Sequence, residues 1–210
     1  NTVHLLGFRE SDLRLPWREG KVHILKMMEG QIVTEDVREE VGYTEEKGRR
    51  VFKPDGTYQK IAAVERHKNT GKIGVGIVKG FGLRGGAIAS SVSHDSHNLI
   101  VIGDNDHDMY LAVQELLRTQ GGYTLVENGQ VFDTLPLPIM GLMSDAGYEK
   151  VNEKLARMIS KAHEMGIPEG FDPFITLSFM ALPVIPEIRI TPRGVYLTQE
   201  DRMIQSPFDR

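Results

Sequence analysis

Residues 94 to 98 hold the densest group of side chains capable of chemistry. The run reads His94-Asp95-Ser96-His97-Asn98. Alternate residues of a strand point to opposite faces, so His94 and His97 would diverge there, whereas a turn could bring the two imidazoles together. Asp95 could then fix the tautomer of a neighbouring histidine for proton transfer or for hydrogen bonding to a substrate. His94, Asp95 and His97 are therefore the catalytic candidates, and a polar turn that satisfies only its own backbone is the alternative.

A second polar run, Glu65-Arg66-His67, follows an apolar stretch that is typical of a strand. The Arg66 guanidinium could bind a carboxylate bidentately, while an exposed strand end with ordinary charges is the competing interpretation. Because both polar runs border predicted strands, we expect them to meet at one rim of a sheet. The candidates for substrate binding or for an interface are Glu65, Arg66, His67, Ser96 and Asn98.

No complete metal site is expected in this chain. It has no cysteine, which excludes thiolate sites, and His94 and His97 are poorly spaced for joint ligation. The acidic residues from Asp104 to Asp108 could resemble a cation loop. They fit better as the N-terminal cap of a helix, where acidic groups favour the helix dipole.

Composition narrows the class of protein. The 210 residues are 40% hydrophobic and 26% charged, which is ordinary for a globular chain. A formal charge of −4 without a basic stripe disfavours nucleic-acid binding. No apolar run approaches the ~18 residues of a membrane span and no leader is evident. We expect a cytoplasmic protein, with which the lack of cysteine is compatible. The sequence opens on Asn1 without Met, so we expect a fragment of a longer protein.

We expect an extended linker over residues 1–20, a folded domain over 21–200 and a polar tail over 201–210. A first hairpin should run from Val22 to Val33, and the charged residues 35–50 should form a solvated loop or a short helix. A strand over 73–82 places four glycines on one face. That bare face could admit another backbone or a planar ligand, or could simply be a tightly covered sheet face.

The β-branched run 99–102 predicts a central strand covered on both faces. Helices are predicted over 107–119 and 146–165, and the first should join two parallel strands in a βαβ unit. Asn128-Gly129 predicts a hairpin, and 174–182 is expected to be a strand. Prolines make 135–143 an irregular apolar edge. The predicted fold class is α/β to α+β, with a mixed β-sheet, a βαβ unit, hairpins and two main packing helices.

Several separated motifs together resemble the C-terminal domain of bacterial and archaeal adenine deaminases over about residues 22–197. They are Val64-Glu65-Arg66-His67, Gly80-Phe81-Gly82-Leu83, Gly85 to Val92, His94 to Asn98, Leu135-Pro136-Leu137-Pro138, Gly141-Leu142-Met143-Ser144-Asp145 and Pro183-Val184-Ile185-Pro186. The resemblance implies a module attached to an amidohydrolase barrel that converts adenine and water to hypoxanthine and ammonia. It also implies a divalent metal, manganese, iron or zinc, held in that barrel.

The His-x-His pair of such barrels is absent from this chain, so the resemblance assigns no catalytic role to any one residue here. We expect the chain alone to be inactive, with its polar cluster facing the barrel or the mouth of its active site. The expected partners are the N-terminal barrel, adenine in the full-length protein and further copies in a homo-oligomer. The alternative function is a purely structural or oligomerisation domain without contact to substrate.

Overall fold

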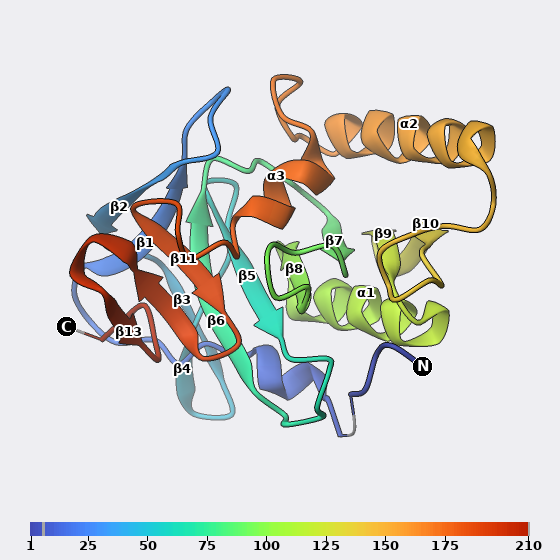
Figure 1. The fold of residues 1–210 in the computed structure, drawn as a ribbon. Coiled ribbons are helices and arrows are strands. Elements are labelled where there is room, and N and C mark those ends of the chain that lie inside the picture. The colour runs from blue at the N-terminus through green and yellow to red at the C-terminus, as the bar shows by residue number, and fades with distance from the viewer. Residues whose placement is uncertain (6, 210) are drawn as a thin grey trace.

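A mixed eight-stranded sheet forms the centre of the computed structural model, which describes residues 1–5 and 7–209 (Figure 1). Its strand order is β10-β9-β7-β8-β5-β6-β1-β2. All neighbouring strands are antiparallel except β1 and β6. The strands are β1 (Val22–Met27), β2 (Thr34–Glu39), β5 (Tyr58–Val64), β6 (Ile73–Lys79), β7 (Gly86–Ser90), β8 (Leu99–Gly103), β9 (Gly122–Glu127) and β10 (Gln130–Pro136). The sheet confirms the predicted α+β class.

β8 is central and buried on both faces, as its β-branched sequence predicts. It lies between β7 and β5 in the sheet. Ile100 and Ile102 belong to one hydrophobic cluster, whereas Leu99 and Val101 belong to the other. The alternation of a strand thus divides one apolar run between two cores.

Helix α1 (Asp106–Thr119) connects β8 to β9. Both strands run antiparallel to β7, which lies between them, so they are parallel to each other and the predicted βαβ unit is confirmed. The interpretation of residues 104–108 as a helix cap is also confirmed, because the Asn105 side chain accepts a hydrogen bond from Asp108 N at the start of α1. The small side chains of Ala87 and Ala89 on β7 share a core cluster with residues of this helix.

Helices α2 (Tyr148–Glu164) and α3 (Pro173–Phe179) contribute to the other core cluster, and α3 crosses in front of the sheet in Figure 1. The prediction of a strand over 174–182 is wrong. The Asp172 carboxylate accepts hydrogen bonds from Phe174 N and Ile175 N and so caps a helix with Pro173 in its first turn. A short apolar run fits either structure, and this cap decided it.

The prediction of a loop or helix over residues 35–50 is also wrong. This stretch forms β2 and much of a separate hairpin, β3 (Tyr43–Glu46) with β4 (Arg49–Phe52). Charge does not exclude an edge strand, because side chains on its open face remain in water and pair across strands. Glu35 Oε2 lies 2.6 Å from Lys26 Nζ, and Glu39 Oε1 lies 2.7 Å from Lys79 Nζ.

A second sheet covers the glycine face of β6. It contains β11 (Ile188–Thr191), β12 (Gly194–Leu197) and β13 (Arg202–Ile204), with the 3-10 helix η2 (Thr198–Glu200) before β13. A Cβ atom on Gly74 would lie only 1.9 Å from the Thr191 carbonyl oxygen. Gly74 therefore permits close approach of another backbone, and this face is tightly covered. The predicted strand over 73–82 is too long, because β6 ends at Lys79 and Gly80 and Gly82 lie beyond it.

Residues outside the predicted domain also pack against the core. The stretch expected to be a linker contains a 3-10 helix, η1 (Glu10–Leu13), and buries Leu13 and Leu15. The expected tail supplies β13 and the buried Phe208. The domain boundaries themselves stay predictions. In the described part of the chain, no helix combines the length and the apolar character needed to cross a membrane.

Candidate functional site

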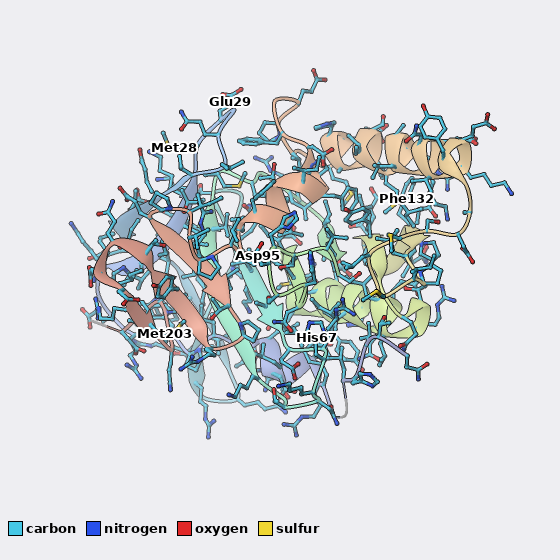
Figure 2. The ribbon with its side chains drawn as sticks, viewed as in Figure 1. Met28, Glu29, His67, Asp95, Phe132 and Met203 are labelled. Atoms are coloured by element: carbon cyan, nitrogen blue, oxygen red, sulfur yellow. The ribbon has the colours of Figure 1, made fainter. Side chains whose placement is uncertain are left out.

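The two polar runs meet at one rim of the main sheet, where β5 ends and β8 begins. The strands are antiparallel, and Val64 is paired with Leu99. Residues that follow Val64 must therefore lie beside residues that precede Leu99. His67 and Asp95, one residue from each run, are labelled in Figure 2.

Three hydrogen bonds join the runs directly. Arg66 N donates to Asn98 Oδ1 at 3.2 Å, and Arg66 Nε donates to the His97 carbonyl at 2.5 Å. The His67 Nε2 atom lies 2.7 Å from the Ser96 carbonyl, so this nitrogen is the protonated donor. The prediction that the two runs cluster at one rim is confirmed.

Arg66 is the centre of this cluster. Its side chain is 2% exposed, and burial lowers the pKa of its guanidinium. Besides His97 it reaches two distant carbonyls, with Nη1 2.5 Å from Thr2 O and Nη2 3.1 Å from Met140 O. All these acceptors are main-chain atoms of three different segments. The geometry therefore favours a positioning role over capture of a substrate carboxylate.

The two imidazoles converge in a turn rather than diverging along a strand. The ring centroids of His94 and His97 are 5.4 Å apart, and the other neighbour of the His94 ring is Phe179 of α3 at 5.0 Å. Ser93 N donates to His97 Nδ1 at 3.3 Å, which leaves the proton of the neutral ring on Nε2.

The charge state of His97 follows from its surroundings. Burial lowers the pKa of its imidazole, and the nearby charges of His94 and Arg66 lower it further, while Asp95 acts in the opposite direction. His97 is therefore a neutral ring near neutral pH. In that state its Nε2 can donate a hydrogen bond to a ligand.

Asp95 and Ser93 line a pocket of about 410 Å³ beside the turn. The Asp95 carboxylate is exposed and accepts no hydrogen bond from the described residues. The buried Ser93 hydroxyl likewise has no partner among them. Much of the remaining lining is apolar, and it includes Ala63, Ala181, Pro183, Ile190 and Pro192. A few polar groups over apolar walls are typical of small-molecule sites.

Glu65 holds its own loop together rather than facing a ligand. Its carboxylate accepts hydrogen bonds from the backbone N–H groups of His67, Lys68 and Thr70 and from the Thr70 hydroxyl. Partial burial raises the pKa of this carboxyl, but these bonds outweigh burial and lower it to about 2. Glu65 is thus ionised at neutral pH and spends its acceptor capacity locally.

Residues 31–202 match the sequence model of a family described as adenine deaminase C-terminal domain. This chain belongs to that family. An adenine deaminase of Desulfitobacterium hafniense strain Y51 is 51% identical over 204 residues, which are 97% of this chain and 35% of the relative. One from Nitratidesulfovibrio vulgaris strain DP4 is 45% identical over 197 residues, 93% of this chain and 34% of the relative. The chain thus spans about a third of the length of these relatives.

This adenine deaminase C-terminal domain has a further part of the site that sequence reasoning missed. The loop from Ile139 to Met143 lies against Arg66, and Ser91 Oγ donates to the Gly141 carbonyl at 2.6 Å. Gly141 has φ +74°, and a Cβ atom there would lie 2.9 Å from Arg66 Nη1. The glycine after the Leu-Pro-Leu-Pro run was the available signal, but its sequence shows only a turn, not the arginine beside it.

Within residues 1–5 and 7–209, no three His, Asp or Glu side chains are grouped so that they could hold a metal ion. The described residues therefore offer no site of three His or carboxylate ligands for the divalent metal that the family resemblance implies.

Proposed function

We propose that this C-terminal domain serves an enzyme that converts adenine and water to hypoxanthine and ammonia. The rim formed by residues 65–67 and 94–98 would pack against a metal-bearing amidohydrolase barrel and complete the mouth of its active site. One observation carries the proposal. In a chain of this family, one turn carries both an unpaired Asp95 carboxylate and a neutral His97 ring.

The chemistry of these two residues suits a purine. A purine base carries N–H donors and ring-nitrogen acceptors, which need an acceptor and a donor, respectively, from the protein. The Asp95 carboxylate can only accept, and His97 Nε2 can donate. Arg66 would keep the turn in place through its bond to the His97 carbonyl. These residues would thus bind and orient the base.

The remaining properties of the whole enzyme are part of the same proposal. Manganese, iron or zinc would reside in the barrel, where metal-bound water is a strong nucleophile near neutral pH. We also infer a cytoplasmic enzyme that forms a homo-oligomer. The metal rests on the family resemblance, whereas the cytoplasmic location rests on the composition of the sequence.

A purely structural role is the second candidate, and one observation favours it. The charged groups of Glu65 and Arg66 are occupied by hydrogen bonds within the domain. If His94, Asp95 and His97 acted in the same way, the cluster would support only folding or assembly.

Ammonia release from adenine separates the two functions. We expect no turnover by the isolated 210-residue chain, even with manganese, iron or zinc. In the full-length enzyme, His97→Ala and Asp95→Ala should lower turnover well beyond any loss of folded protein. Glu169→Ala, outside both runs, should leave turnover unchanged. Turnover by the isolated chain would refute its predicted inactivity, and full activity of both rim variants would favour the structural role.

A further inference from the structure

An unusual amount of apolar surface is concentrated between β10 and the start of α2. Ten large apolar side chains are exposed in the described part of the chain, and six of them lie within residues 131–148. The most exposed of these six are Tyr148 at 79%, Met140 at 64% and Met143 at 53%. A concentration of this kind marks an interaction surface more often than ordinary solvent-facing structure. Ile139, Met140 and Met143 are called the apolar loop surface below.

Hydrogen bonds hold this loop in one conformation although its apolar side chains are exposed. Ile139 and Met143 exchange backbone hydrogen bonds of 3.1 Å in each direction, which closes the loop with Met140 near its tip. The Met140 carbonyl accepts from Arg66, and the Gly141 carbonyl accepts from Ser91. A loop already ordered loses little conformational entropy when it binds, so apolar side chains on it are well suited to docking.

The beginning of the chain lies beside the same loop. Arg66 donates both to Thr2 O and to Met140 O, so one guanidinium joins the first residues to the loop. Figure 1 shows the N-terminus at the same end of the molecule as the connection from β10 to α2. This chain covers only 34–35% of the two relatives named above. Because the matching family is described as a C-terminal domain, the rest of such a protein precedes that domain. The preceding part would therefore emerge next to the exposed side chains.

We propose that the apolar loop surface docks on the part of the longer protein that precedes this domain. Arg66 connects that surface to the His97 turn, so docking would place His97 at the junction between the two parts. The identity of the docked part as the amidohydrolase barrel rests on the proposed function. The docking itself requires only the surface and its position.

Hydrogen exchange measures this docking directly. We expect the amides of residues 139–143 to exchange at least about tenfold more slowly in the full-length protein than in the isolated 210-residue chain, because docking limits local opening. This protection should not vary with protein concentration. Met140→Glu and Met143→Glu should each reduce it in the full-length protein. Val184→Glu is the matched control, since Val184 is 76% exposed but lies outside the surface, and it should leave the protection unchanged.

Two results would overturn the docking proposal. Equal exchange of residues 139–143 in both proteins would show that the preceding part does not cover them. Protection that appears in the isolated chain as its concentration rises would assign the surface to a second copy instead. Adenine turnover is measured on the same full-length samples. Protection without turnover would refute the proposed reaction alone, whereas turnover without protection would refute the docking alone.

Discussion

The guanidinium of Arg66 donates from Nε to the main-chain carbonyl of His97 across 2.5 Å. The same side chain bonds to Thr2 and Met140, so the histidine turn, the first residues and the exposed apolar loop share one buried cation. A charged donor forms stronger bonds to carbonyls than a neutral one does. The conformation of the turn and that of the loop are consequently coupled.

Replacing Arg66 tests this coupling. Arg66→Met should lower the free energy of unfolding by about 3 kcal/mol or more, because each buried carbonyl left without a donor costs about 1–3 kcal/mol. The stability of Arg66→Lys should lie between that of the original chain and that of Arg66→Met, since an ammonium cannot reproduce the planar arrangement of donors. Urea unfolding provides the measurement, with the exposed Lys68→Met as control. If Arg66→Met unfolds at the same urea concentration as the original chain, the guanidinium does not hold these segments.

The titration of His97 tests the electrostatics of the turn. Its pKa should lie below the ordinary value of 6.5, because burial and the neighbouring His94 and Arg66 disfavour the charged imidazole. His94→Gln removes one of these causes and should raise the pKa of His97. Histidine ring resonances followed by NMR from pH 4 to 8 provide the measurement, and His163→Gln should leave the His97 curve in place. A His97 pKa above 6.5 would contradict the burial of its ring beside His94 and Arg66.

Glu65 should give the domain a specific acid sensitivity. Its carboxyl has a pKa of about 2 in the folded chain against an ordinary value of 4.5. The stability it contributes is therefore fully present above about pH 4.5 and is lost as the pH falls toward about 2. Glu65→Gln should be less stable than the original chain at pH 6, and this difference should shrink as the pH falls to 2.

Urea unfolding at several pH values measures the effect of Glu65, and Glu169→Gln serves as the control at an exposed site. A gap between Glu65→Gln and the original chain that is the same at pH 6 and pH 2 would show that the ionised carboxylate does not stabilise its loop.

A pair of glycine substitutions tests the close contact between the two sheets. Gly74→Ala should cost roughly 1–3 kcal/mol, because its Cβ atom would meet the Thr191 carbonyl and force the backbones apart. Gly42→Ala is the matched control, since no atom lies within 4 Å of its added Cβ and its φ is not in the left-handed region. It should be neutral or slightly stabilising. Thermal unfolding distinguishes them, and equal melting temperatures would refute the contact.

Local sequence patterns determined much of the framework. The β-branched run at residues 99–102 predicts β8, and the turn at Asn128-Gly129 predicts the hairpin of β9 and β10. These patterns work because burial on two faces and a tight turn each need particular residue types within a few positions. They fail where neighbours or caps decide, as in the charged edge strand β2 and the short helix α3.

The sequence by itself also determined which side chains could do chemistry and, through the strands that they border, that residues 65–67 and 94–98 share a rim. Only the tertiary structure decided what each side chain does there. The acceptors of the Arg66 guanidinium lie 31, 64 and 74 residues away. The aromatic neighbour of His94 is on α3, which sequence reasoning took for a strand. Contacts of such separation depend on how whole elements pack, and no local periodicity contains them.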